Sequence, residues 1–543
     1  MKRRDFLKAA TLGAAAMFAA PVSAKSRTAG AASTSTGNFR VRGFELDEMT
    51  IGQLQAGMAT GRFTAASLTK KYLARIEELD RRGPTLMSVI EINPDALAIA
   101  REVDWQRKAS GPRGPLHGIP VLIKDNIGTH DRMSTTAGSL ALSGSIPPFD
   151  AFLVERLHEA GAVLLGKTNL SEWANFRSTH SISGWSGRGG LTQNPYALDR
   201  NPSGSSSGSA VAVAANLCVL AVGTETDGSI LSPSSFNGIV GVKPTVGLIS
   251  RTGVIPIAQS QDTAGPMART VTDAAILLGC LSALDPRDEA TKASSGKAHR
   301  DYTRFLDRDG LRGARLGLAR KFFGVHPGAD KLIEAAVAEM KRLGAVVVDP
   351  ADLPTHGGFS DSEEAVLLYE FKADLNAYLA GLGPQAPVRT LHDLIEFNER
   401  HREKEMPLFG QELFLKAEAK GPLTEKAYRD ALEKNHQLTR EEGIDAVMNR
   451  HQLDAIVALT TGPAHMTDWV YGDRDTGGST SPAAVAGYPS VTVPAGFVSG
   501  LPIGISFFGR AWSEPTLLKL AFAFEQATKF RAPPRFLPSV APG

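Results

Sequence analysis

Short apolar runs alternate with longer segments of helical periodicity along most of this chain. The runs have the length and composition of buried strands. They cover residues 119–124, 162–166, 219–224, 314–319, 345–350 and 454–460, and two further runs, 490–497 and 503–509, precede an amphipathic helix expected over 515–529. Such alternation predicts an α/β protein with a largely parallel or mixed sheet covered by helices.

Two segments depart from this alternation. Residues 25–44 begin with a stretch rich in Ser, Thr, Ala and Gly and are expected to form a flexible linker. Residues 362–450 are charged, helical in pattern and poor in strand-forming residues. This second segment is either a helical insertion over a functional site or a plain layer of surface helices. The remaining chain, residues 45–540, is expected to form one large domain.

The first 24 residues have the order of an export signal. A basic start with Arg3 and Arg4 is followed by an apolar, Ala-rich run and by small residues that end at Ala24. Paired arginines before Asp-Phe-Leu-Lys resemble a twin-arginine signal. The protein is therefore expected in the periplasm or outside the cell.

Composition narrows the classes of partner. The chain has 59 Lys and Arg against 57 Asp and Glu, so its charge is close to neutral with or without the signal. A near-neutral chain gives no electrostatic reason to expect nucleic acid or an anionic membrane as partner. The chain is expected to be a monomer. Cys218 and Cys280 lie in apolar runs, which favours two buried thiols over a disulfide. No metal-binding motif occurs, so neither metal nor cofactor is expected.

The chemistry is concentrated in two Ser/Gly-rich segments, residues 203–210 and 223–230, and in Lys124 at the end of an apolar run. Burial at a strand end would lower the pKa of Lys124 and make a neutral amine available as base. Gly228 allows a tight turn before Ser229, so the backbone amides of Thr226, Asp227, Gly228 and Ser229 could form an oxyanion hole beside a serine nucleophile. None of the twelve histidines stands in a catalytic signature.

Two other motifs give weaker alternatives. Residues 204–208 fit G-x-S-x-G around Ser206, but a polar loop precedes them where an α/β-hydrolase has a strand. Residues 161–168 match the phosphate-loop pattern literally, yet Ala-Val-Leu-Leu has the character of a strand, with Lys167 at its polar exit. A nucleotide-binding protein therefore stays a less favoured interpretation.

Five ordered motifs together resemble the amidase signature family and, within it, the bacterial peptide amidases. They occupy residues 115–127, 166–178, 201–215, 223–245 and 260–275. The resemblance implies a single large domain whose mixed, largely parallel, twisted sheet carries helices on both faces. It also implies that Ser229 is the nucleophile, that Lys124 is the base, and that Ser205 bridges these two residues. In the family the peptide bond before the bridging serine, here Gly204-Ser205, is cis.

The implied reaction passes through an acyl-enzyme and releases ammonia from C-terminal peptide amides. A broader specificity for small aliphatic or aryl amides, or a non-catalytic relative, stays open. Expected substrate contacts are Ser206, Phe176, Trp185, Trp469 and Tyr471. The chain departs from the family pattern at Ser203, Ser207, Glu225 and Asp227, and at Leu231 where many members have Arg, which puts the usual ion pairs near the nucleophile in doubt.

Overall fold

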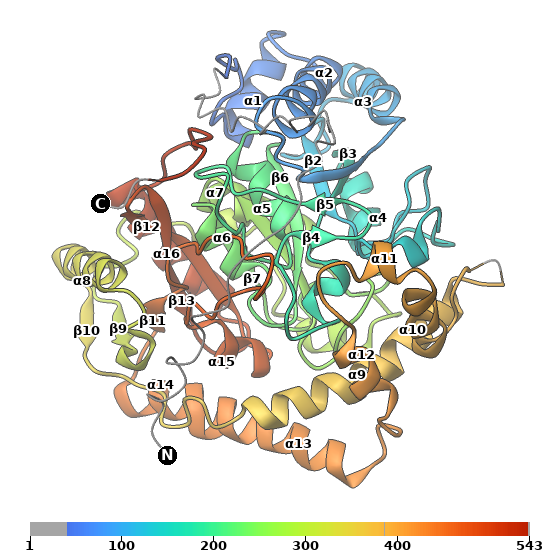
Figure 1. The fold of residues 1–543 in the computed structure, drawn as a ribbon. Coiled ribbons are helices and arrows are strands. Elements are labelled where there is room, and N and C mark those ends of the chain that lie inside the picture. Colours follow the sequence, from blue (N-terminus) through green and yellow to red (C-terminus); the bar gives the residue numbers. More distant parts are fainter. Residues whose placement is uncertain (1–40, 385, 541–543) are drawn as a thin grey trace, which may run out of the picture. The chain divides into compact units, whose positions relative to one another are not determined.

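A computed structural model describes residues 41–384 and 386–540, and one eleven-stranded sheet organises them (Figure 1). The export signal predicted over 1–24 lies outside the described residues. In spatial order the strands are β1 (Val89–Ile92), β3 (Val163–Thr168), β2 (Pro120–Lys124), β6 (Leu220–Glu225), β8 (Thr263–Ala268), β7 (Val240–Lys243), β12 (Ser490–Val498), β13 (Leu501–Phe508), β11 (Ala455–Leu459), β9 (Arg315–Leu318) and β10 (Val346–Val348).

The sheet is mixed, as predicted. Strand β2 pairs in parallel with β3 and with β6, and β9 pairs in parallel with β10 and with β11; the other neighbours are antiparallel. Each predicted apolar run became a strand of this sheet. Parallel pairing of β2 with β6 matters most for function, because the carboxyl ends of the two strands carry Lys124 and Thr224 to the same edge.

Sixteen α-helices surround the sheet within the described residues. They are α1 (Ile51–Ala59), α2 (Ala65–Ile76), α3 (Ala96–Ser110), α4 (Phe152–Glu159), α5 (Ser207–Ala214), α6 (Leu231–Phe236), α7 (Val271–Leu281), α8 (Pro327–Arg342), α9 (Ser360–Gly381), α10 (Leu391–Arg400), α11 (Arg402–Glu405), α12 (Glu412–Glu418), α13 (Lys426–His436), α14 (Asp445–His451), α15 (Thr480–Val485) and α16 (Glu514–Thr528).

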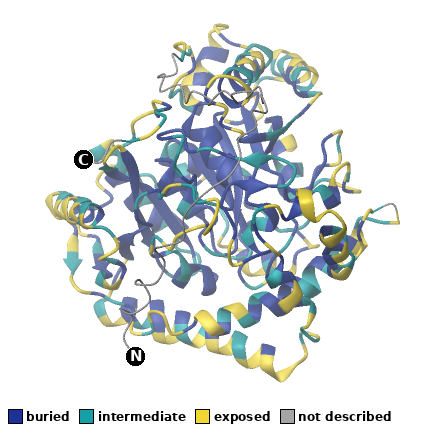
Figure 2. Cartoon of the chain, viewed as in Figure 1, coloured by how far each residue is buried: buried dark blue, intermediate teal, exposed yellow. Residues whose placement is uncertain are grey.

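Two layers of helices pack on the sheet and enclose its core. Helices α5 and α6 contact each other and the strands β6, β7 and β12, whereas α7 and α16 contact each other and the strands β8, β12 and β13. The strands are almost entirely buried, and the helices expose one side (Figure 2). Helix α5 is an exception because all its residues are buried, which its small side chains permit. The large single domain of this α/β fold is thus built around one central sheet.

The charged segment predicted to be helical forms α9 to α14. Helix α9 packs Leu368, Phe371 and Leu375 into a second hydrophobic cluster with Trp173 and Phe176. A π-helical segment, Gln437–Ile444, joins α13 to α14. Helix α9 is therefore fixed against the segment that follows β3, close to the motifs that carry the predicted chemistry.

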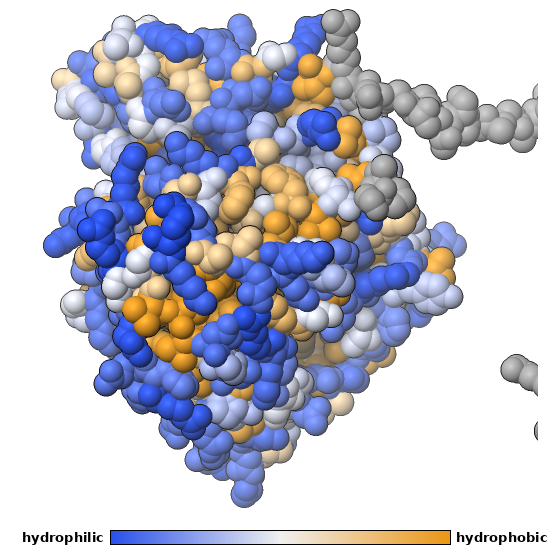
Figure 3. All heavy atoms as spheres, turned by 90° about the vertical axis from the view of Figure 1, so that its left-hand side faces the viewer, coloured by the Kyte–Doolittle hydropathy of each residue, from blue (hydrophilic) through white to orange (hydrophobic). Residues whose placement is uncertain are grey.

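Figure 3 shows one face of the molecule, on which hydrophilic residues surround smaller hydrophobic areas. Between residues 41 and 540, no helix combines the length and the apolar character needed to cross a bilayer. Cys218 is buried, Cys280 is partly buried, and both are free thiols, so the prediction of two unpaired cysteines is confirmed.

Candidate functional site

Lys124 ends β2 in a fully buried position, and its amine meets the Ser/Gly-rich segment directly. Lys124 Nζ donates to Ser205 Oγ at 2.7 Å and to Thr224 Oγ1 at 2.9 Å. Asn126 Nδ2 donates to the same Thr224 hydroxyl at 3.0 Å. No carboxylate is hydrogen-bonded to the amine among the described residues, so its position depends on hydroxyl and carbonyl groups alone.

Burial lowers the pKa of Lys124 to about 7, although the charges of Asp262 and Glu225 act in the opposite direction. A lysine with this pKa exists to a large extent as the neutral amine at neutral pH. The side chain can therefore accept a proton, which an exposed lysine with its ordinary pKa could rarely do.

Ser205 lies at the start of the turn into α5 and is completely buried. The peptide bond between Gly204 and Ser205 is cis, as the family resemblance implied. Gly204 is needed for close packing, because a Cβ there would collide with Ser171 Oγ. The turn therefore packs tightly where it holds the Ser205 hydroxyl within hydrogen-bond distance of Lys124.

Ser229 lies in the turn between β6 and α6, and its backbone contacts Ser206, the residue after Ser205. The Ser206 N–H donates to the Ser229 carbonyl oxygen at 3.1 Å, and the Ser229 side chain keeps a small exposed fraction of 8%. Within the described chain no hydrogen bond joins Ser229 Oγ to Ser205 Oγ. Catalytic hydrogen bonds are often loose before substrate binds, so direct contact between the two hydroxyls stays a prediction.

The turn before Ser229 presents a row of free backbone donors. Among the described residues, none accepts a hydrogen bond from the N–H of Thr226, Asp227, Gly228 or Ser229. Gly228 has φ +75°, and a Cβ there would lie 3.0 Å from the Thr480 hydroxyl. Unused amides of successive residues are what an oxyanion hole requires, and their role as such a hole stays a prediction.

The unusual acids of this turn have defined structural partners. Glu225 accepts hydrogen bonds from the N–H of Ile230 and Leu231 at 2.7 and 3.0 Å, so it caps α6. Asp227 accepts a hydrogen bond from Thr480 Oγ1 at 3.0 Å, and the Glu363 carboxyl lies nearby. Burial, followed by the charge of Asp227, raises the pKa of Glu363 well above its ordinary value, which keeps a proton on this pair.

Two cavities border the turn. The first, here called the polar cavity, has a volume of about 520 Å³ and is lined by hydroxyls of Ser203, Ser232 and Thr480 and by the carboxyl of Glu363. The second, here called the acidic cavity, has a volume of about 430 Å³ and reaches Asn126, Thr224 and Thr226. Helix α9 lines both, with Glu363 in one and Asp374 in the other. The helical segment 362–450 thus supplies walls on either side of the turn.

The structure separates the expected substrate contacts from these cavities. Ser206 Oγ donates to the Thr224 carbonyl oxygen at 3.0 Å, so this hydroxyl holds β6 rather than an open surface. Phe176 packs on Phe371, and Trp185 packs on Phe409. Trp469 and Tyr471 are 50% and 76% exposed. None of the five lines the polar or the acidic cavity.

The competing motifs have structural roles. Residues Val163–Thr168 form strand β3, and the fully buried Lys167 donates to Thr135 Oγ1 at 2.9 Å. A phosphate loop would be a turn with free amides, so this segment has no phosphate-binding geometry. A loop precedes Ser206, as expected, and no histidine of the described chain hydrogen-bonds to Ser205, Ser206 or Ser229.

Several neighbours of the site were not identified from the sequence: Asn126, Thr224, Asp262, Glu363 and Lys243. Asn126 and Thr224 lie in the very motifs that carry Lys124 and Ser229, so their position at a strand end could have marked them. Lys243 is buried near Glu225 and Glu514, whose charges oppose the burial that lowers its pKa to about 8. For Glu363, more than a hundred residues away from Ser229, no local signal exists.

A buried amine, two serines and a row of free amides at the carboxyl edge of a mixed sheet are the groups that an enzyme of acyl transfer requires. Comparison with known proteins gives the family. The amidase family profile matches residues 67–518. A "Probable amidase" of Arabidopsis thaliana is 46% identical over 91% of this chain and 93% of its own length. One subunit of the glutamyl-tRNA(Gln) amidotransferase of Chloroflexus aurantiacus is 36% identical over 90% of this chain and 98% of its own.

Solved structures agree with this result. The native peptide amidase of Stenotrophomonas maltophilia is 54% identical, with a TM-score of 0.87 over 91% of this chain and 100% of that chain. A peptide amidase in complex with the competitive inhibitor chymostatin gives a TM-score of 0.88 at 54% identity, over 90% of this chain and 100% of that chain. The chain belongs to the amidase signature family and is a hydrolase that acts on amide bonds.

Proposed function

We propose that this enzyme hydrolyses the C-terminal carboxamide of peptides and releases ammonia, with Ser229 as nucleophile, Ser205 as proton relay and Lys124 as base. The observation that carries the proposal is the buried amine of Lys124 at 2.7 Å from Ser205 Oγ. The likeness to peptide amidases over nearly the whole chain supports the choice of substrate.

In the proposed first half-reaction, neutral Lys124 takes the proton of Ser205 while Ser205 takes the proton of Ser229. The Ser229 oxygen attacks the carboxamide carbon, and the free amides from Thr226 to Ser229 stabilise the negative charge on the carbonyl oxygen. One such donor contributes roughly 3–4 kcal/mol to transition-state stabilisation. Protonated Lys124 then returns its proton through Ser205 to the departing nitrogen, and ammonia leaves an acyl-enzyme.

In the second half-reaction water replaces Ser229 as the attacking group. The same relay removes a proton from water, and the tetrahedral intermediate collapses to release a carboxylic acid and the serine hydroxyl. Atoms and charge balance over the cycle, since one amide and one water become one acid and one ammonia. The polar cavity beside Ser203, Ser232 and Thr480 offers the hydroxyls that a peptide backbone needs as partners.

The test is ammonia release from a panel that holds an N-acetyl dipeptide amide, a small aliphatic amide, an aryl amide and free glutamine. We expect the peptide amide to be the best substrate. Ser229→Ala, Ser205→Ala and Lys124→Ala should each lower kcat by about a thousandfold or more. Ser207→Ala is the matched control, because the Ser207 hydroxyl donates to the Ser203 carbonyl oxygen and does not reach the amine.

Turnover at the wild-type rate in all three site variants would refute the mechanism. Preference for an aliphatic or aryl amide would keep the mechanism and replace the substrate by the broader amidase interpretation. Glutamine as best substrate would instead favour the activity suggested by the likeness to an amidotransferase.

The proposal includes a location. Arg3, Arg4, the apolar run behind them and the small residues before Lys25 support export of the folded enzyme by the twin-arginine route. An exported amidase would meet peptide amides outside the cytoplasm.

A further inference from the structure

The acidic cavity extends from the environment of Lys124 to helix α9. Asn126, Thr224 and Thr226 form its inner end, the loop 251–262 forms one wall, and Asp374 and Tyr378 of α9 form another. Thr224 Oγ1 accepts a hydrogen bond from Lys124 at 2.9 Å. A group bound in this cavity would therefore lie close to the reacting centre.

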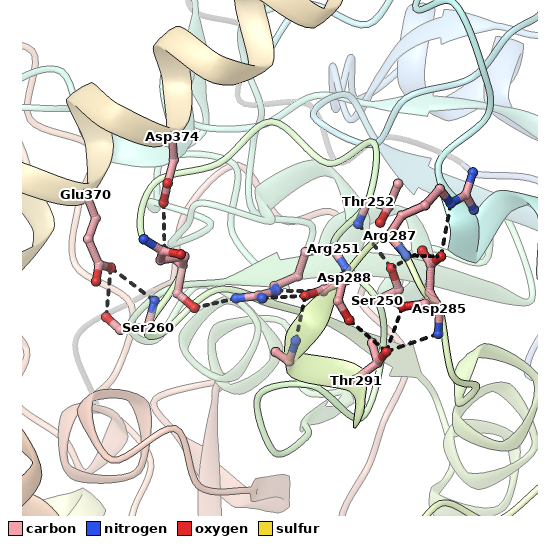
Figure 4. Close-up of polar contacts among 12 residues, drawn as sticks. Ser250, Arg251, Thr252, Ser260, Asp285, Arg287, Asp288, Thr291, Glu370 and Asp374 are labelled. Atoms are coloured by element: carbon pink, nitrogen blue, oxygen red, sulfur yellow. Dashed lines mark hydrogen bonds and ion pairs between the residues drawn. The ribbon is translucent and has the colours of Figure 1, made fainter. Parts of the chain in front are cut away.

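The wall formed by loop 251–262 is held rigidly (Figure 4). Arg251 makes hydrogen bonds to Asp288 with distances of 2.6 and 2.9 Å. Asp374 accepts a hydrogen bond from the Gln259 N–H at 3.0 Å, and Glu370 accepts from Ser260. The cavity is thus built by interactions on both sides of the loop.

The charges that line the cavity are unbalanced. Arg251 is paired with Asp288, and Arg287 is paired with Glu155 and Asp285, so both arginines are neutralised by their own partners. Asp262 and Asp374 have no ion-pair partner among the described residues. Burial and the charges of Glu370 and Asp262 raise the pKa of Asp374 to about 7, against the smaller opposite effect of Arg251. A cation beside Asp374 would relieve this repulsion.

A second, independent feature points to a missing hydrogen-bond donor. Asn126 lines the cavity, is only 3% exposed, and its Oδ1 has no hydrogen-bond partner within the described chain. Tyr378 Oη, on the opposite wall, also lacks a partner there. Buried polar atoms are nearly always satisfied, so a ligand that donates hydrogen bonds fits this site.

The middle of loop 251–262 gives its wall an apolar surface. Val254, Ile255, Pro256 and Ile257 follow one another along the loop. Apolar walls with a few acceptors at defined points select a ligand that has an alkyl stem and a donating, positively charged end.

We propose that the acidic cavity is a substrate subsite for a primary ammonium group on a short alkyl chain. The inference rests on the proposed function and adds a preference to it. The ammonium group belongs either to the side chain of the residue that bears the carboxamide or to an amine leaving group, and both sources share the same chemistry.

The test compares matched charged and uncharged substrates in two arms. The first arm measures kcat/KM for N-acetyl dipeptide amides that end in lysine or in norleucine. The second arm uses one peptide acid joined to 1,5-diaminopentane or to pentylamine. In one arm we expect the charged substrate to be favoured about five- to tenfold, and the arm that shows the preference identifies the source.

Asp374→Asn should reduce the ratio of kcat/KM for the charged substrate to kcat/KM for the uncharged one to about one. Asp361→Asn is the control, because Asp361 lies on the same helix, is exposed and borders neither cavity. A ratio near one in both arms of the wild type, or a preference that persists in Asp374→Asn, would overturn the inference.

Failure of the proposed function gives a different result from failure of the subsite. In that case the peptide amide that ends in norleucine would release no ammonia, or would release it equally fast with Ser229→Ala. In that case calorimetric binding of pentylammonium, compared between wild type and Asp374→Asn, tests the cavity by itself. Binding weakened in the variant supports the subsite, and equal or absent binding refutes it.

Discussion

Burial alone gives Lys124 the low pKa that a general base requires. Its pKa of about 7 follows from burial, so the fraction of neutral amine rises as pH rises through 7. We expect kcat/KM for a peptide amide to rise about tenfold per pH unit below this value and to level off above it. A pH profile from 5 to 9 measures this.

The control for this profile is Asp374→Asn, because Asp374 also has a pKa of about 7. The rise of kcat/KM with pH below about 7 should persist in that variant. A flat profile, or activity that falls between pH 6 and 8, would contradict the role of neutral Lys124.

The same burial has a cost in stability. An unfolded lysine binds a proton up to about pH 10.4, whereas folded Lys124 loses it near 7. Between these values the unfolded state binds more protons, so the free energy of unfolding falls as pH is lowered from about 10 to 7. Lys124→Met removes this dependence and should gain about 1–3 kcal/mol relative to wild type over that range.

Urea unfolding of both proteins at pH 7 and pH 9.5 gives the comparison. The difference in free energy of unfolding between Lys124→Met and wild type should be larger at pH 7. An equal difference at both pH values would mean that Lys124 stays protonated in the folded enzyme.

Gly228 permits the turn that frees four backbone donors. Gly228→Ala places a Cβ at 3.0 Å from the Thr480 hydroxyl in a left-handed conformation, and displacement of one amide should lower kcat by about a hundredfold. Gly61→Ala is the matched control, because φ is +76° there and no atom lies within 4 Å of the added Cβ. It should cost about 1 kcal/mol of stability without loss of kcat. Equal kcat values in the two variants would argue against an oxyanion role for the turn.

At the scale of elements, helix α9 links the helical segment to the site. Glu370 is fully buried and accepts hydrogen bonds from Ser260 Oγ at 2.8 Å and from Tyr428 Oη at 2.7 Å. Glu370→Ala leaves these donors unpaired and should lower the free energy of unfolding by about 2–4 kcal/mol. Glu364 lies on the exposed side of the same helix. Glu364→Ala removes only a surface ion pair with Lys416 and should change the free energy of unfolding by less than about 1 kcal/mol.

Denaturant unfolding of both variants measures the difference in the free energy of unfolding. KM for a peptide amide shows whether loop 251–262, to which Glu370 is hydrogen-bonded, keeps its position. Similar stabilities for the two variants would show that α9 is only a surface layer. This outcome would return the segment to the plainer of the two sequence interpretations.

The elements were predicted where periodicity was strong. Each apolar run that was predicted to be a strand became one, because burial on both faces of the sheet requires such a run. Strands β7 and β8 were not predicted, since Val240–Lys243 is short and Thr263–Ala268 contains Gly and Pro. Their pairing is decided by neighbouring strands and not by local composition.

At the scale of the whole molecule, the family resemblance paired Lys124 with Ser205. The fold brings them together because Lys124 ends β2 and the turn that holds Ser205 is hydrogen-bonded, through Ser206, to Thr224 near the carboxyl end of the adjacent parallel strand β6. The cavities could not be predicted. Glu363, Asp374 and Asp262 meet only through the packing of α9 on loop 251–262, and no periodicity encodes that contact. Aromatic residues were expected as pocket walls from their type alone, and none of them lines the polar or the acidic cavity.

The proposed export is the remaining property of the whole chain, and it would depend on Arg3 and Arg4, which lie outside the described residues. A twin-arginine signal tolerates little change at its arginine pair because a receptor reads these residues. Arg3→Lys with Arg4→Lys should therefore hold the enzyme in the cytoplasmic fraction of a bacterial host with this route. Wild type should reach the periplasm with a new N-terminus after Ala24. Fractionation, ammonia release in each fraction and the mass of the N-terminal peptide measure the outcome. Arg27→Lys, beyond the expected cleavage site, is the control and should be exported normally. Export of the double variant at the wild-type level, or retention of Met1 in the exported protein, would show that residues 1–24 do not act as this signal.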